Sequence, residues 1–312
     1  MSVIIKSFAV SDENGEAGDM FYIKHTFSNF TIIDCCMVEE NQKAIMDEIT
    51  EAKEGKAITR FISTHPDEDH ICGLGYLDEV IGLLNFYCAE NKAKKNNPSE
   101  SFSHYCMLRD DKEKHYFVYK DCKRKWMNDN DENDGRNYGS SGINFLWPDT
   151  SDEDFQEAQR QAEEGKAYNN LSPIFTYTLS GNIRAMWMGD MEHNFLEKIK
   201  DKVSWPEIDV LFAPHHGRDS GKVSNDVLKK LNPHIIVIGE APAEHLNYYS
   251  GYNTIKQNSA GNIVFVCSEK KVHVYVSKSS YRYDTSFLRN EHAENYTYGY
   301  YLGSFTPKGA QV

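Results

Sequence analysis

Apolar and polar positions alternate along most of the chain with two different periods, which is typical of a layered α/β protein. Runs rich in β-branched and aromatic residues predict strands, and they lie at 2–10, 20–35 (two strands turning at 28–29), 57–64, 143–148, 171–190 (a hairpin turning at 180–182), 208–217, 234–242, 261–267 and 271–277. Apolar residues at helical spacing predict helices, and these lie at 41–55, 73–92, 152–165, 191–203 and 224–231.

Two segments depart from this pattern. Residues 91–141 are polar, charged and turn-rich around a β-like piece at 114–120, and we interpret them as an excursion from the domain that has no core of its own. Residues 279–312 form a tyrosine-rich C-terminal extension. We expect this extension to pack on the domain, or to mediate contact with a protein partner or a second copy of the chain. Stacking on nucleic-acid bases is the alternative.

The bulk composition narrows the class of protein. The chain has 312 residues, of which 40% are hydrophobic, so it is globular and able to bury a core. No apolar run approaches the roughly 20 residues of a membrane span, and residues 1–16 do not resemble a signal peptide. We therefore expect a cytoplasmic protein without membrane contact. The net charge of −13 argues against a general nucleic-acid coat protein, but it leaves a nuclease open because bound cations offset acidic residues.

The segment STHPDEDHICGL, residues 63–74, concentrates histidines and acids between a predicted strand and a predicted helix. Like charges this close repel one another, so the cluster either lies in water as an acidic turn or surrounds a metal ion. Loops at strand ends are where layered α/β folds place ligand and metal sites. The metal interpretation therefore fits the position of the segment.

Two further strand ends carry the same residue types. Asp190 follows one predicted strand, and His215 and His216 follow another. Taken singly, Asp190 is also a helix N-cap candidate and the two histidines are also structural candidates. Taken together, the three strand ends predict a centre with two divalent ions about 3.5–4 Å apart. The residues predicted to bind these ions are His65, Asp67, Asp69, His70, Asp190, which bridges both ions, and His215.

Several motifs resemble the metallo-β-lactamase-fold hydrolases, and most closely the hydrolase domain of the ComEC DNA-uptake proteins. They are HPDEDH at 65–70, GD at 189–190, PHHG at 214–217, AYNNLSPIFTY at 167–177, GDMFYI at 18–23, TIIDC at 31–35 and INFLWP at 143–148. The resemblance covers residues 1–278. It implies an αββα sandwich, in which two mixed β-sheets pack face to face with helices outside.

The resemblance also bears on the metal ligands. Many relatives have a histidine where this chain has Asn169 and Asn170, so the shell of one ion would be rich in oxygen. Oxygen-rich shells favour Mn²⁺, with Zn²⁺ as the alternative. A last metal-binding histidine often lies late in the fold, and His245 is the candidate here, although an exposed loop histidine is an equal interpretation.

The predicted chemistry is hydrolysis of a phosphodiester in DNA, RNA or a nucleotide, by a hydroxide held between the two ions. Asp69 would orient this nucleophile, and His216 would donate a proton or contact the substrate. The residues predicted to contact the substrate are Asn169, Asn170, Arg218 and Lys222. Two alternatives remain open: hydrolysis of a small ester, thioester or lactam on the same fold, and a non-catalytic interaction module stabilised by metal.

Overall fold

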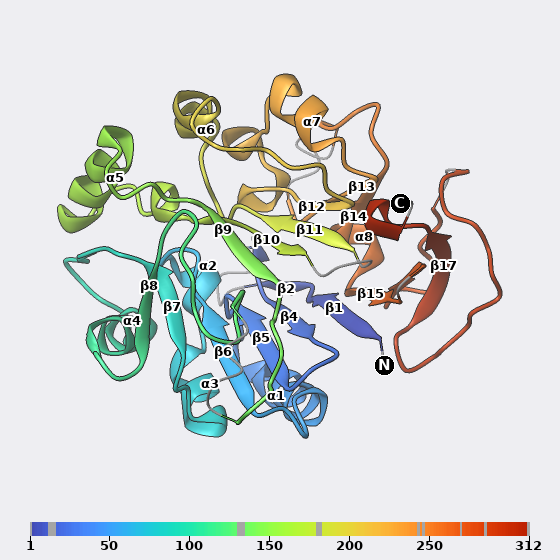
Figure 1. Cartoon of the computed structure of the whole chain (residues 1–312), viewed down its shortest axis with the longest axis horizontal. Helices are drawn as coiled ribbons and strands as arrows, with labels where there is room; N and C mark the ends of the chain where they lie inside the picture. Colours follow the sequence, from blue (N-terminus) through green and yellow to red (C-terminus); the bar gives the residue numbers. More distant parts are fainter. Residues whose placement is uncertain are drawn as a thin grey trace.

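Two mixed β-sheets form the centre of the molecule in the computed structural model (Figure 1). The structure describes residues 2–11, 17–129, 135–178, 183–241, 244, 247–268, 270–283 and 286–310. Within these residues, one sheet has the order β17(Tyr300–Phe305), β16(Val272–Val276), β15(Ile263–Cys267), β1(Val3–Ser7), β4(Phe21–Lys24), β5(Asn29–Ile33), β6(Ile58–Ile62), β7(Phe86–Ala89) and β8(His115–Val118). The other has the order β14(Thr254–Lys256), β13(Ile235–Ile238), β12(Val210–Phe212), β11(Arg184–Trp187), β10(Ile174–Thr178) and β9(Ile143–Trp147). A short pair joins β2(Val10–Ser11) to β3(Ala17–Gly18).

The two sheets pack face to face through a shared apolar core. Trp187 on β11 stacks on Phe175 of β10 and on Phe212 of β12, with ring centroids 5.5 and 4.7 Å apart. Phe21 on β4 of the opposite sheet meets Phe212 edge to face at 5.0 Å. Aromatic rings in these arrangements contribute beyond their buried area. They fix the first sheet against the second.

Helices cover the outer face of each sheet. The helices are α1(Glu39–Ala52), α2(Glu68–Ile71), α3(Leu74–Ile81), α4(Glu100–Asp110), α5(Glu153–Glu163), α6(His193–Ile199), α7(Asn225–Leu231) and α8(Gln257–Ala260). Neighbouring residues on a strand face opposite ways: Ile62 of β6 belongs to the core between the sheets, whereas Phe61 packs in the outer cluster with apolar residues of α1, α3 and α4. On the other sheet Trp147 of β9 meets Phe155 of α5 and Phe195 of α6, at 6.0 and 6.1 Å.

These four layers confirm the predicted fold class, an α/β sandwich with helices outside two mixed sheets. In the first sheet β4 pairs antiparallel with both β1 and β5, whereas β5, β6, β7 and β8 run parallel to one another. In the second sheet β9, β10 and β11 are antiparallel and β11 to β14 are parallel. The turn of the predicted hairpin, residues 180–182, lies outside the described residues, but its two strands pair as predicted.

The prediction of one helix over residues 73–92 is wrong in its second half. Helix α3 ends at Gly82, whose φ of +68° suits glycine and stops the helix. The chain then forms β7, all four of whose residues are buried in the parallel part of the sheet. A fully buried strand has a continuous apolar run, which periodicity alone does not distinguish from a buried helix.

The two segments that departed from the sequence pattern contain regular structure. In the excursion 91–141, Ser99 caps α4 by accepting a hydrogen bond from the backbone N–H of Phe102 at 3.0 Å, a helix that the sequence analysis did not predict. The β-like piece forms β8 at the edge of the sheet. In the C-terminal extension, β17 pairs antiparallel with β16. The domain boundary at 278 stays a prediction. No helix among the described residues has the length and apolar character to cross a membrane.

Candidate metal centre

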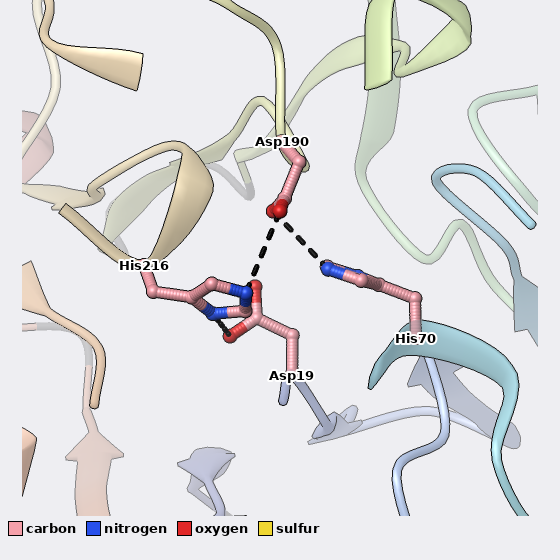
Figure 2. Close-up of side chains that lie close together, drawn as sticks. All are labelled: Asp19, His70, Asp190 and His216. Carbon is pink, nitrogen blue, oxygen red and sulfur yellow. Dashed lines mark hydrogen bonds and ion pairs between the residues drawn. The ribbon is translucent and has the colours of Figure 1, made fainter. Parts of the chain in front are cut away.

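Histidine and aspartate side chains from both sheets converge at the rim where β6, β11 and β12 end (Figure 2). Asp19 precedes β4, His70 lies in α2 beyond β6, Asp190 follows β11, and His216 follows β12 in the turn at His215–Gly217. One ligand atom of each of these four residues lies within 4.8 Å of the others. A second group of the same kind joins His65, Asp69 and His70. His70 therefore belongs to both groups.

Asp190 is the carboxylate on which the centre converges. Its Oδ1 lies 3.1 Å from His70 Nε2, and its Oδ2 lies 3.4 Å from His216 Nε2 and 3.6 Å from His215 Nε2. The residue is only 2% exposed. A carboxylate buried among imidazoles in this way satisfies the geometric condition for a bridging or shared metal ligand.

Hydrogen bonds on the Nδ1 side of the histidines leave their Nε2 atoms facing the centre. Thr64 donates its backbone N–H and its hydroxyl to Asp34, each at 2.7 Å. Since the hydroxyl proton is used there, Thr64 Oγ1 accepts from His65 Nδ1 at 3.1 Å, and His65 Nε2 carries a free lone pair. His70 donates Nδ1–H to Asp34 at 2.9 Å, and His216 donates Nδ1–H to Asp19 at 3.2 Å. Carboxylates on the outer nitrogen are typical of metal-binding histidines.

Three buried atoms at the centre, His65 Nε2, His70 Nε2 and Asp190 Oδ1, make no hydrogen bond of good geometry within the described residues, and the last two lie 3.1 Å apart as an ion pair. Buried polar atoms are almost always hydrogen-bonded, so each such atom calls for an explanation. A divalent cation accepts lone pairs from both imidazole nitrogen and carboxylate oxygen. The donor set therefore fits a metal ion.

The electrostatics of the centre point the same way. Burial and the neighbouring His70 lower the pKa of His65 to about 3, so His65 is neutral. Burial also opposes charge on His70, but the carboxylates of Asp190 and Asp69 outweigh it and raise the pKa of His70 well above its usual value. Burial of Asp190 would raise its pKa, but His216 and His70 outweigh this effect and hold the pKa well below its usual value. The buried carboxylates of this centre are therefore stabilised by nearby positive charge, which a divalent ion would supply.

Two residues of the centre were missed by the sequence analysis as functional candidates. Asp19 and Asp34 both hold a histidine, and Asp34 is fully buried with a φ of +53°. Both lie at strand ends, in the GD and IID stretches, but each is a single acid without a neighbouring cluster. The contact from Asp19 to His216 spans 197 residues, so no local pattern reveals it.

The two histidines of the PHHG motif occupy different places. His216 is buried, and its Nε2 lies 3.2 Å from Asp69 Oδ2 and within the group of four. His215 is partly exposed at the edge of the centre, with Nδ1 2.8 Å from Ser220 Oγ. Both have positive φ, 52° and 55°, a strained backbone that accumulates at functional sites. The geometry thus places His216 deeper among the acids than His215, and the assignment of ligand and proton-donor roles stays a prediction.

The remaining candidates lie around this centre. Asp67 Oδ2 is 3.5 Å from His65 Nε2. The Asn170 side chain bonds to Glu192 and Asn169 begins the same short helical turn. The Nε atom of Arg218 is buried without a hydrogen bond within the described residues, and Lys222 Nζ lies 5.3 Å from the ring centroid of Tyr248. His245 lies outside the described residues.

Gly189 sets the approach of β11 to the centre. It has a φ of +51°, and a Cβ atom there would lie 2.6 Å from Ser172 Oγ and 2.7 Å from Thr64 Cβ. We expect Gly189→Ala to lower the free energy of unfolding by about 1–3 kcal/mol, because both the backbone and the space exclude a side chain. Urea denaturation measures this loss. Gly55→Ala is the matched control, since Gly55 also has positive φ, +73°, but has nothing within 4 Å of the added Cβ. Equal losses in both variants would contradict the steric explanation.

Comparison with known proteins adds only a limited likeness. No family model matches the chain, and no curated protein sequence matches it. Among solved structures, it is similar to Igni18, described as a novel metallo hydrolase from the hyperthermophilic archaeon Ignicoccus hospitalis KIN4/I. The two share 13% identity with a TM-score of 0.46, over 84% of this chain and 98% of that one. A likeness of this size establishes neither family nor activity, so the chain is defined by its own features, an αββα sandwich with a candidate histidine–aspartate metal centre.

Proposed function

We propose that the chain is a metal-dependent hydrolase that cleaves phosphodiester bonds, with a nucleic acid or a nucleotide as its substrate. The observation that carries this proposal is the convergence of two overlapping groups of possible metal ligands at the rim of the sandwich, Asp19, His70, Asp190 and His216 in one and His65, Asp69 and His70 in the other. Hydrogen bonds from Nδ1 of His65 and His70 to Thr64 and Asp34 hold these two rings with their Nε2 atoms facing the centre.

The acids and histidines of the centre each have a defined task in this proposal. Asp69, His70, Asp190 and His216 would hold the divalent cation, since each histidine Nε2 lies within 4 Å of a carboxylate oxygen of both acids. When bound, a divalent cation stabilises charge on a phosphoryl oxygen and lowers the pKa of a water molecule. His215 lies at the edge, and when Ser220 donates its hydroxyl proton to Nδ1, His215 Nε2 carries a proton for the leaving oxygen. The sequence analysis gave this task to His216, whose ring lies between Asp19 and Asp69 and is less available.

A phosphodiester is supported over a neutral ester by the cations next to the PHHG turn. Arg218 follows the two histidines directly, and its Nε has no hydrogen-bond partner within the described part of the chain. Guanidinium groups with free donors bind phosphate oxygens in a bidentate manner. Lys222 lies four residues further along. The resemblance of PHHG and the preceding motifs to ComEC-type hydrolases supports the same substrate class.

The test is turnover by the purified chain of a labelled DNA, a labelled RNA, cyclic nucleotides and a bis-ester phosphate reporter, each with Mn²⁺, Zn²⁺ or Mg²⁺. We expect cleavage of at least one phosphodiester, fastest with Mn²⁺ because the donor set is rich in carboxylates. Asp69→Ala combined with His70→Ala should abolish it. Asp201→Asn is the matched control, because Asp201 is an exposed acid on the surface, where it lies 3.9 Å from Lys230.

Other outcomes would refute the proposal. Turnover of a thioester or a lactam without any phosphodiester would assign the chain to the other class of hydrolase on this fold. Metal binding with no turnover of either would favour the non-catalytic module. Phosphodiester cleavage that persists in the Asp69 and His70 double variant would locate the activity elsewhere.

A further inference from the structure

Lys95 reaches the candidate centre from the excursion 91–141. Its Nζ lies 3.5 Å from Asp67 Oδ1 and 3.6 Å from Glu68 Oε1. The same atom lies over the rings of Phe102 and Tyr168, 4.9 and 5.3 Å from their centroids. The side chain is only 18% exposed. Two carboxylates and two ring faces around one ammonium group make a complete cation-binding pocket.

The walls of this pocket are themselves held in place. Glu68 accepts a short hydrogen bond from the hydroxyl of Ser99, the residue that caps α4. Phe102 lies in the first turn of that helix. The neighbouring Lys94 shows the contrast: its side chain is 67% exposed and pairs with Glu163 at 3.2 Å on the surface. Lys95 is therefore a fixed charge, whereas Lys94 is an ordinary surface lysine.

The ammonium group of Lys95 lies beside the predicted site of the first ion. Asp67 belongs to the motif expected to bind the first ion together with His65, and its two oxygens are divided between Lys95 Nζ on one side and His65 Nε2 on the other. A divalent ion between Asp67 and His65 would lie next to an ammonium group of the same sign, in a partly buried site where the side chain of His65 is 1% and that of Asp67 31% exposed. Like charges at this distance repel more strongly in such a partly buried site than in bulk water.

The amide of Asn170, one of the two residues that stand where many relatives have a histidine, is also engaged. Asn170 Nδ2 donates to Glu192 Oε2 at 2.9 Å, and Asn170 Oδ1 accepts from the backbone N–H of Glu192 at 3.2 Å. Both ends of the amide are thus occupied within the fold. Of the ligands predicted for the first ion, Asp67 is thus shared with Lys95, and Asp190 lies 3.1 Å from His70 of the other group.

The predicted site of the second ion does not lack ligands in this way. Asp69, His70, Asp190 and His216 surround it, with each histidine Nε2 within 4 Å of a carboxylate oxygen of both acids, and Asp19 and Asp34 support its two histidines. We propose that the chain binds one divalent ion tightly, at this second position, and that the ammonium of Lys95 takes the place of a second ion beside Asp67. The inference rests on the metal centre of the proposed function, although not on its substrate. Lys95 acts here as a positioning residue, because it engages a candidate ligand and not the reacting atoms.

The experiment counts ions without any substrate. Isothermal titration of the metal-free chain with Mn²⁺, together with elemental analysis after gel filtration, should give one tight equivalent per chain in the wild type. In Lys95→Met the affinity for a second equivalent should rise roughly tenfold or more, since the competing charge is gone. Lys94→Met is the matched control and should leave both equivalents unchanged. Lys95→Arg, which keeps the charge, should also leave one tight equivalent.

A double variant tests the same inference without relying on the Lys95 substitution alone. Asn170→His combined with Lys95→Met restores an imidazole and frees Asp67, so two tight equivalents are expected, with the fold checked by circular dichroism. Two equivalents of comparable affinity in the wild type would overturn the inference, as would an unchanged second affinity in Lys95→Met. A chain that binds one ion and cleaves no phosphodiester would refute the proposed function alone. A chain that cleaves phosphodiesters with two tight ions would refute this inference alone.

Discussion

Asp190→Asn is expected to abolish metal-dependent turnover, lowering it by about 10³-fold or more, and to remove the stabilisation that added metal confers. The reason is geometric: the two oxygens of Asp190 face His70 on one side and His215 and His216 on the other. Asparagine keeps the shape but loses the charge and offers one oxygen. A ligand present at 100 times its dissociation constant stabilises a protein by about 2.7 kcal/mol. Thermal melting with and without Mn²⁺ measures this shift directly.

The control for Asp190→Asn is Asp201→Asn, which removes an exposed acid that belongs to neither group of possible metal ligands. That variant should keep both the turnover and the upward shift in melting temperature. If Asp190→Asn melted at higher temperature with Mn²⁺ by as much as the wild type, Asp190 would not be a ligand, and the centre as described would be wrong.

Asp34→Ala is expected to lower the free energy of unfolding by about 3–5 kcal/mol, the range found when one partner of a buried charged pair is removed. Asp34 is fully buried and accepts three hydrogen bonds, two from Thr64 and one from His70. Its loss leaves those donors unpaired and releases the ring of His70. Urea denaturation of the metal-free chain measures the change, so that metal affinity does not enter the result.

Asp34→Asn separates shape from charge at this position. The side-chain oxygen of asparagine still accepts from the Thr64 backbone N–H. Its NH₂ group, however, is a donor that faces two other donors, the hydroxyl of Thr64 and the Nδ1–H of His70. We expect a smaller loss of stability than in Asp34→Ala together with weakened metal binding, by roughly 10- to 100-fold as for other supporting carboxylates. Unchanged stability in both variants would show that the Asp34 network is not formed in solution.

The sequence predicted the location of the centre because its parts follow a general rule. Polar residues at the ends of strands in a layered α/β fold gather at one rim, and the loop 65–70, Asp190 and the PHHG turn do so. What the sequence could not reveal are contacts between single residues far apart along the chain. Lys95 occurs in a stretch whose composition is that of a solvated loop, and its pocket forms only when α4 packs beside α2.

The orientations of the two adjacent histidines were equally beyond local reasoning. The sequence shows that His215 and His216 are neighbours but not which way each ring points, and the roles of His215 as ligand and His216 as proton donor or substrate contact stay predictions. The turn gives both residues positive φ, and His216 consequently lies between Asp19 and Asp69 while His215 stays at the edge. The helix predicted over 73–92 failed for a related reason, since burial on both faces erases the alternation that identifies a strand.

The distribution of the ligands over both sheets has a kinetic consequence. His70 comes from the side of the sheet that contains β6, and Asp190 and His216 come from the side that contains β11 and β12. Neither half of the sandwich alone presents a complete set of donors, so strong cation capture must wait until the halves have docked. A cation bound there would connect the two sheets, and it would slow their separation during unfolding more than it would speed their docking.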